Sequence, residues 1–393
     1  MNSIKKYASA FADVLGMELY NIATRPIYWF CMIIFPMFVI FFFTNIMEEN
    51  LPTDMPVGLV DLDNSSTSRK LARRLDAFQN SQIVAHYPSV TEARKAMQKN
   101  EIYAFLYIPE GLSEDMIGGR QPKISFYYNN SILLAGSLTY KEMRAISAIG
   151  ASGYTLAKMQ KQGYTDKQIM TYLQPVLIDT HAIDNPWLNY NAYLCGTIIP
   201  ASLALFICLM TAYTIGAEIK FDRSKIWLRK AQNSIIIALT GKMLPQTAIF
   251  SIIVWFYQYW LYIHLGFPHN CGFTLIMLIG LLLVLAMQGF GIFIFGIMPS
   301  LRMSLSICSL WSVLSFSISG FTFPLDAMDR AIQAISWLFP MRSYFMIYQM
   351  NIFHGYPVGY SWAYYIALIA FVFAPLLVLR HLKKVLNEFE YIP

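Results

Sequence analysis

The chain has 393 residues, of which 56% are hydrophobic and only 13% are charged. Because an average soluble domain is roughly one-quarter charged, this composition excludes an ordinary soluble protein and predicts a protein embedded in a membrane. The net charge of +6 does not indicate nucleic-acid binding, since residues 48–190 hold 14 Lys and Arg against 15 Asp and Glu, and the excess lies in short loops beside apolar runs. Anionic lipid headgroups account for such loops.

Residues 1–25 predict an amphipathic helix. Apolar side chains recur at helical spacing from Ile4 to Leu15, with Lys5, Lys6 and Asp13 between them. A helix with one apolar and one charged face can lie in the plane of the membrane surface. We therefore expect a cytoplasmic interfacial helix ahead of the first span.

Residues 26–47 predict the first of six transmembrane helices. Its apolar run is followed by NIMEENLP, which offers no small-residue cleavage site, so we expect a retained anchor rather than a signal peptide. Each of the six runs holds about 20 apolar residues, enough to cross a ~30 Å hydrocarbon core as a helix. The other five runs are 191–217, 245–265, 273–298, 303–323 and 361–379, all within residues 188–393.

Residues 48–187 predict an α/β domain inserted between the first two spans. Runs rich in β-branched and aromatic residues predict strands at 56–63, 81–87, 102–109 and 123–129. Helical patterns predict helices at 66–78, at 90–98 behind a Ser89 cap, and at 133–161. Strands that alternate with helices are typical of a layered α/β domain. The fold class is thus an α-helical polytopic membrane protein with an inserted α/β domain.

The string DLDNSS in this domain resembles a calcium loop only in part. Asp61, Asp63 and Ser65 stand at alternate positions, but Ser66 replaces the turn glycine and no Glu stands at the twelfth position. The favoured interpretation is a strand end followed by a helix cap at Asn64 or Ser65. We expect no metal site here.

A charged loop, residues 218–233, separates the second and third spans. Ser224 can cap a short helix through KIWLRKA, in which apolar and cationic side chains are interleaved. Such a helix can dock in a groove of a partner protein, or it can lie at the interface with its cations among lipid headgroups. The loop by itself favours neither alternative.

The six predicted spans contain no Asp, Glu, Lys or Arg in their interiors, and Gln288 is the most polar side chain at depth. Carriers driven by protons or sodium normally keep ionisable residues in the membrane. A phosphate-binding loop is excluded as well, because the pair Gly241-Lys242 is followed by Met243 rather than Ser or Thr. We expect no catalytic residue and no cofactor in this chain, so the energy for transport would come from elsewhere.

Three glycines in MQGFGIFIFG, namely Gly289, Gly291 and Gly296, miss the spacing of a dinucleotide-binding motif. They lie inside a predicted span, where small residues let helices approach closely. We expect them to serve helix packing.

Residues 324–344 lie between the fifth and sixth spans and contain two prolines, Pro324 and Pro340. The apolar stretch 331–339 between them is too short to cross the membrane. We therefore expect re-entrant or surface-lying helices at the outer face, with an ordinary apolar outer loop as the alternative.

Lys and Arg indicate the orientation of the chain. They gather in the N-terminal segment, in loop 218–233, around Arg302 and in the C-terminal tail, while the alternate connections hold few. Cytoplasmic loops are enriched in these residues. Both termini are therefore expected in the cytoplasm, as six crossings require, and residues 48–187 outside it.

Three stretches of the chain resemble the permease (transmembrane) subunits of type-2 ATP-binding-cassette (ABC) exporters, in the branch with a large extracytoplasmic domain between spans one and two. VDLDNSSTSRKLARRLD (60–76) with AFLYIPEGLSEDMIGGRQPKISFYYNN (104–130) is similar to the outer domain of that branch. GAEIKFDRSKIWLRKAQNSIIIALTGKMLP (216–245) is similar to its Glu-led cytoplasmic loop. SGFTFPLDAMDRAIQAISWLFPMRSY (319–344) is similar to its motif at the outer end of the fifth span and is the most specific match.

The resemblance implies which residues serve which role. The coupling helix, which would sit in a cleft of a separate ATPase, would use Glu218, Asp222, Arg223, Ser224, Lys225, Trp227, Leu228 and Arg229. The re-entrant outer gate would use Gly320, Phe323, Pro324, Met328 and Pro340. The family usually has Gly-Thr at the start of the coupling helix where this chain has Arg223-Ser224.

The resemblance also implies partners and a location. ATP and Mg would be bound by the partner ABC ATPase, and a second permease copy or a paralogue would complete a dimer. A periplasmic adaptor protein would be a further partner of the outer domain. The protein would reside in the bacterial cytoplasmic (inner) membrane as a multi-pass exporter of the multidrug efflux type. Its substrate would be hydrophobic or amphipathic, since the spans offer no charge to hold an ionic one.

A rival interpretation is a non-pumping membrane scaffold or receptor whose extracytoplasmic domain binds a ligand or a partner protein. It predicts a protein that is stable and functional without any ATPase. A neighbouring gene for an ABC ATPase would argue against it.

Overall fold

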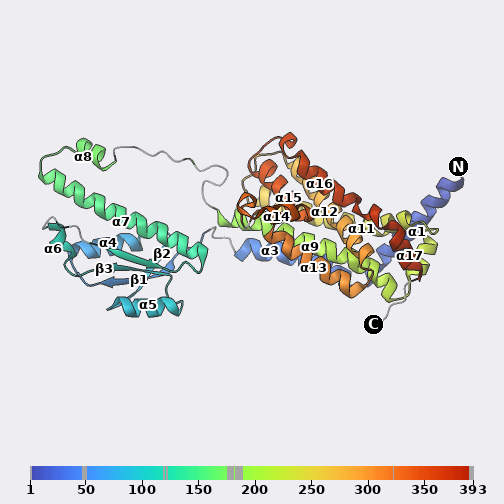
Figure 1. Ribbon diagram of the computed structural model, residues 1–393, viewed down its shortest axis with the longest axis horizontal. Coiled ribbons are helices and arrows are strands. Elements are labelled where there is room, and N and C mark those ends of the chain that lie inside the picture. Colours follow the sequence, from blue (N-terminus) through green and yellow to red (C-terminus); the bar gives the residue numbers. More distant parts are fainter. Residues whose placement is uncertain are drawn as a thin grey trace. The chain divides into compact units, whose positions relative to one another are not determined.

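The structure is a computed structural model (Figure 1) and describes residues 2–46, 51–117, 120, 123–174, 181, 189–321 and 323–388. The chain divides into two compact units, one of residues 1–48 with 183–393 and the other of residues 49–182. The predicted domain boundaries at 47–48 and 187–188 lie outside the described residues.

The first unit consists of helices. Among the described residues, four helices are long and apolar enough to cross a membrane: Pro26–Ile46, Tyr190–Lys220, Ile235–His264 and Phe273–Ile297. A bent pair, Trp362–Leu377 with Leu379–Glu388, meets at 41° and supplies a fifth candidate if it forms one span. The unit is that of a polytopic membrane protein. The predicted span 303–323 corresponds to a shorter apolar helix, Leu301–Ser317, so six crossings stay a prediction.

The described residues include three π-helical segments, one inside the first span and two at the ends of other helices. The first span is built from α2 (Pro26–Trp29), η1 (Phe30–Ile34) and α3 (Phe35–Ile46), and η1 is the π segment. The other two π segments, η2 (Trp260–His264) and η5 (Tyr348–Phe353), end the helices α11 (Ile235–Tyr259) and α15 (Pro340–Ile347).

The helix α9 (Tyr190–Lys220) packs most extensively on α12 (Phe273–Ile297) and α13 (Leu301–Ser317). Glycines permit this packing, as expected. A Cβ atom at Gly291 would lie 2.9 Å from the Cys208 carbonyl oxygen of α9. A Cβ atom at Gly289 would collide with the Phe371 carbonyl oxygen of α16 (Trp362–Phe373).

The N-terminal helix α1 (Asn2–Thr24) forms as predicted, and its interfacial location stays a prediction. Its face with Val14 and Glu18 is buried against α11, while Tyr7 and Tyr20 on other faces are exposed. Gly241 of α11 makes room for this contact, because a Cβ atom there would lie 3.0 Å from Val14 Cγ1. The helix is thus part of the packed bundle.

The rest of the unit is made of short helical elements. They are α10 (Ser224–Lys230), η3 (Leu325–Ala327), α14 (Arg330–Ile335), η4 (Ser336–Leu338), η6 (Val358–Tyr360), η7 (Ala374–Leu377) and α17 (Leu379–Glu388).

The second unit has a four-stranded sheet of order β2-β1-β3-β4. The strands are β1 (Met55–Asp61), β2 (Ser81–His86), β3 (Ala104–Ile108) and β4 (Ser125–Tyr128). β1 pairs in parallel with β2 and β3, and β4 pairs antiparallel with β3. All four predicted strands are confirmed, with ends that differ by no more than two residues.

Helices cover both faces of this sheet (Figure 1). One apolar cluster joins strand residues such as Leu59 and Leu106 to Leu75 of α4 (Ser66–Asp76) and Met143 of α7 (Leu133–Lys161). A second cluster joins Val60 and Phe105 to α5 (Val90–Gln98). The predicted helices are therefore confirmed, while α6 (Leu112–Ile117) and α8 (Asp166–Leu173) were not expected.

Local side-chain bonds set the starts of α4 and α5. Ser65 Oγ accepts from the Ser68 amide at 3.1 Å, and Ser89 Oγ accepts from the Glu92 amide at 3.3 Å. Asp61 Oδ1 accepts backbone N–H groups of the turn that precedes α4. The DLDNSS string is thus a strand end with a helix cap, the favoured interpretation.

Candidate functional site

The helix α10 joins α9 to α11, and a left-handed residue at each end fixes its direction. Just after α9, Asp222 adopts φ 52°, and the Arg223 amide donates to the Glu218 carbonyl at 2.8 Å. α10 ends in the same way, with Gln232 at φ 56° and the Asn233 amide donating to the Leu228 carbonyl at 2.8 Å. Both are Schellman-type endings, which satisfy the last carbonyls of a helix. The turns on both sides of α10 are therefore well-defined.

The predicted cap at Ser224 is wrong. Arg223 holds the N-cap position and Ser224 is the first residue of α10, with no side-chain cap. The Schellman-type ending of α9 places the chain reversal at Asp222, so the helix begins with Ser224 already inside it. Ser224 is 4% exposed and packs inside the unit.

α10 has a buried and an exposed face. Trp227 and Leu228 have no exposed surface. Ile226 is 52% exposed, and Lys225 and Arg229 are exposed as well. A helix of this kind is anchored by its apolar side and presents cations to its surroundings. Any contact with another protein would use the exposed face.

A buried ion cluster lies against the anchored face. Lys242 Nζ of α11 donates to Glu18 Oε2 of α1 at 2.7 Å and to Glu218 Oε1 of α9 at 2.8 Å. These three side chains are at most 2% exposed. The Trp227 ring of α10 lies 5.0 Å from the ammonium, within the range of a cation–π contact. One ammonium thus links four helices.

Amide side chains complete the surroundings of Glu18. Gln246 Nε2 donates to Glu18 Oε1 at 2.9 Å, and Asn21 Nδ2 donates to Glu18 Oε2 at 3.4 Å. Two carboxylates face one ammonium, so the cluster carries a formal charge of −1 that these amides help to stabilise. Burying such charges is costly unless they are paired and hydrogen-bonded. A displacement of any one of the helices would therefore disturb the others.

The expectation that the membrane helices lack buried ionisable groups is wrong. α11 begins at Ile235, ten residues before the predicted span, and so includes Lys242. α9 continues to Lys220 and so includes Glu218. The prediction ended each span at its last apolar residue, whereas ion pairing allows the helices to bury charge beyond that point. The sequence signal that could have identified these buried groups was a single charged residue, such as Lys242, at a position where the helical pattern calls for an apolar one.

The residues predicted for coupling separate into two sets. Glu218, Ser224, Trp227 and Leu228 are buried inside the chain. The other set, Asp222, Arg223, Lys225 and Arg229, keeps some or all of its surface accessible. The buried set holds α10 in place and cannot contact a partner directly, so a docking surface is left to the accessible set.

The residues predicted for the outer gate lie in and beside short helical turns. Gly320 adopts φ 91°, a conformation that favours glycine, and Phe323 is 51% exposed. Pro324 precedes η3, Met328 is half-buried after it, and Pro340 opens α15. The prolines thus bracket short helices, while a re-entrant path through a membrane stays a prediction.

Arg342 is a buried cation in this segment that the sequence did not single out. Its guanidinium lies 4.0 Å from the Trp337 ring centroid and 5.6 Å from that of Tyr364. Nε and Nη1 are buried without a hydrogen-bond partner. Cation–π contacts with both rings therefore stabilise this side chain.

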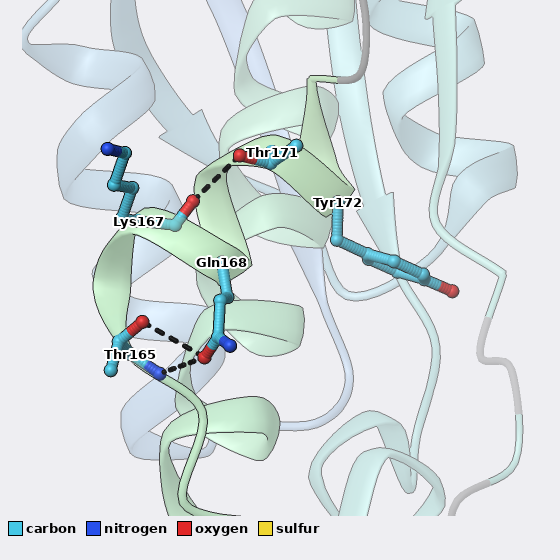
Figure 2. Close-up of a pocket in the computed structure, with 5 residues that line it drawn as sticks. All are labelled: Thr165, Lys167, Gln168, Thr171 and Tyr172. Carbon is cyan, nitrogen blue, oxygen red and sulfur yellow. Dashed lines mark hydrogen bonds between the residues drawn. The ribbon is translucent and has the colours of Figure 1, made fainter.

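A depression on the second unit offers no chemistry. Figure 2 shows its five side chains, Thr165, Lys167, Gln168, Thr171 and Tyr172, all on or beside α8. Their bonds are local, since Gln168 Oε1 accepts from the amide and the hydroxyl of Thr165 and caps the helix. Across the part of the chain that the structure describes, no group of three His, Cys, Asp or Glu is placed to hold a metal ion.

Comparison with known families gives one match. A family model described as ABC-2 family transporter protein matches residues 26–379. The matched range contains α10, Glu218 and Lys242, whereas Glu18 precedes it. No curated protein matches the chain.

Proposed function

Because the chain belongs to the ABC-2 transporter family, we propose that it is the membrane-spanning permease of an ATP-driven exporter and that α10 is its coupling helix. Membership makes the chain a transport subunit that pairs with an ABC ATPase rather than a catalytic subunit. ATP and Mg would be held by that separate ATPase.

The arrangement of α10 is the observation that carries this proposal. A partner that binds Lys225 and its neighbours on the accessible face would also move Trp227 on the buried face. Trp227 lies against Lys242, which binds α1 and α9 through Glu18 and Glu218. Docking of a partner on α10 would thereby affect the positions of α1, α9 and α11 together. An ATPase cleft with acidic side chains would complement the cations.

Exposed cations support the proposed orientation of the chain. α10 and the C-terminal helix α17 carry exposed Lys and Arg, which favour the cytoplasmic side. With six crossings, both termini lie in the cytoplasm and the unit of residues 49–182 lies outside, where a periplasmic adaptor would contact it. The membrane is then the bacterial inner membrane.

A second copy or a paralogue would pack on the α9–α13 face. A depression of about 320 Å³ lies there, lined by apolar side chains together with Ser202, Ser312 and Ser317. Ser312 Oγ is buried without a partner, and Val313 on the same helix is 59% exposed. Apolar walls with a few hydroxyl groups suit a hydrophobic or amphipathic substrate.

Co-purification tests the coupling role. The full chain is expressed with candidate ABC ATPases, and ATP hydrolysis is measured after reconstitution in liposomes. We expect the double variant Lys225→Glu and Arg229→Glu to lose the ATPase subunit and its stimulated hydrolysis. The control Lys70→Glu and Arg73→Glu, which makes the same charge change at exposed positions of α4, should retain both.

Two results would contradict the proposal. If the α10 variant keeps both association and hydrolysis, α10 is not the coupling helix. If the unaltered chain associates with no ATPase, a non-pumping scaffold or receptor that binds a ligand with its outer unit becomes the better explanation.

A further inference from the structure

A groove on the helical unit is lined by no residue of α10. It has a volume of about 330 Å³ and runs between α11, α12 and the connection from α16 to α17. Apolar side chains form most of its wall, and Thr240, Thr247 and Gln288 are the polar members; no charged residue of the described chain lines it. Such a surface suits an uncharged molecule.

Gln288 presents an unused hydrogen-bond donor in this groove. The side chain is 4% exposed, and its Nε2 is buried without a partner. Thr247 Oγ1 lies 2.7 Å from Gln288 Oε1 and 2.9 Å from the Met243 carbonyl oxygen. A hydroxyl has one proton and cannot donate to both. If the Gln288 amide were turned round, its Nε2 would donate to Thr247 Oγ1, yet the second N–H of Nε2 would still lack an acceptor.

The depth of Gln288 makes this donor significant. α12 ends at Ile297, nine residues beyond Gln288, which corresponds to about 14 Å along a helix. Half of a bilayer's hydrocarbon core is about 15 Å thick. Water is scarce at that depth of a bilayer, so a molecule bound in the groove can supply the missing acceptor.

The groove opens toward the surroundings of the bundle. Ile236, Leu244 and Leu376 on its rim are 56%, 51% and 61% exposed. From Ile236 to Thr247 the wall formed by α11 extends about 16 Å. A chain-shaped molecule dissolved in the bilayer can therefore enter sideways and reach Gln288 at the inner end.

We propose that this groove binds an uncharged, chain-shaped amphiphile from the membrane whose carbonyl or ester oxygen accepts a hydrogen bond from Gln288. The absence of charged lining residues among those described rejects ionised molecules, because a charge in this apolar groove would lose its hydration without gaining a partner. The Gln288 amide distinguishes an ester from a plain alkane of the same length. The site is independent of the coupling role of α10.

Photolabelling tests this site. The probe is a methyl ester of a twelve-carbon fatty acid that carries a diazirine, added to the purified chain in liposomes without any ATPase. We expect label on α11, α12 and α16 peptides, competed by unlabelled methyl dodecanoate but not by dodecane or by dodecanoate at neutral pH. Because one hydrogen bond is lost, Gln288→Leu should weaken labelling about tenfold.

Matched variants separate binding from folding. Gln258→Leu removes a different buried glutamine, which lies on α11 and donates to the Ile276 carbonyl outside the groove. This variant should label normally. Thr240→Trp, at an exposed position on the rim, should block labelling by filling the groove and should keep the thermal midpoint. Equal labelling of Gln288→Leu and the unaltered chain would overturn the proposal, as would competition by dodecane.

Discussion

Replacing Lys242 with Met examines the ion cluster most directly. The substitution keeps an unbranched side chain but removes the ammonium that lies 2.7 Å from Glu18 Oε2 and 2.8 Å from Glu218 Oε1. Two carboxylates would then remain with at most 2% of their side chains exposed. Removing one partner of a buried ion pair lowers the free energy of unfolding by about 3–5 kcal/mol. We expect the upper part of that range, because two charges lose the same partner.

A neutral version of the cluster separates charge balance from packing. The triple variant Glu18→Gln, Glu218→Gln and Lys242→Met removes all three charges while keeping the side-chain sizes close. Replacing a whole buried ion cluster by neutral groups is often neutral or stabilising. We expect the triple variant to lie within about 1 kcal/mol of the unaltered chain, since the Oε1 of a glutamine at position 18 can accept from Asn21 Nδ2, and its Nε2 can donate to Gln246 Oε1 once the Gln246 amide is turned round.

The measurement is equilibrium unfolding of the full chain in one detergent, supported by thermal midpoints. We expect the unaltered chain and the triple variant to have similar stability and the Lys242→Met variant to be much less stable than both. If Lys242→Met is as stable as the unaltered chain, the cluster contributes little. If the triple variant is no more stable than Lys242→Met, the loss arises from side-chain shape and the charge argument fails.

Four further substitutions test other contacts. Trp227→Ala, which removes a fully buried indole, should destabilise the chain by about 3–5 kcal/mol, whereas Ile226→Ala on the exposed face should change unfolding by less than about 0.5 kcal/mol; similar losses would show that the two faces are wrongly assigned. Gly289→Ala should cost about 1–3 kcal/mol and lower the thermal midpoint, because the new methyl group meets the backbone of Phe371. Ser65→Ala removes the cap of α4 and should cost about 1 kcal/mol; hydrogen exchange of the α4 amides should rise, and unchanged exchange would contradict the role of the cap.

Local patterns were sufficient for the elements of the sheet unit. β1 and β3 are short apolar runs bounded by polar turns, and Ser65 and Ser89 mark helix starts that the structure confirms. The strand order β2-β1-β3-β4 depends on contacts between distant segments, which a local pattern does not contain. Helix α8 was missed although Thr165 and Gln168 have the spacing of a capping box, in which Gln168 bonds back to Thr165.

The candidate site was predicted only in part, because its geometry is non-local. Lys242 meets Glu218 across 24 positions and Glu18 across 224, so the cluster forms only when α1 packs on α11. For α10, hydropathy identified the apolar residues but could not say whether they face the chain itself or a partner. The burial of Trp227 and Leu228 in their own chain answers that question.

The π-helical segments have a consequence for motion. η1, η2 and η5 occur in three separate helices of the described chain, and a π turn holds about one residue more than an α turn while its peptide groups stay bonded. In the first span, where α3 follows η1, converting this wide turn into an α turn would shift the register by one residue and rotate the part beyond it by about 100° about the axis. A new set of side chains could thus be turned toward a neighbour at the cost of a few reshuffled backbone bonds, so the helices need not move as stiff rods.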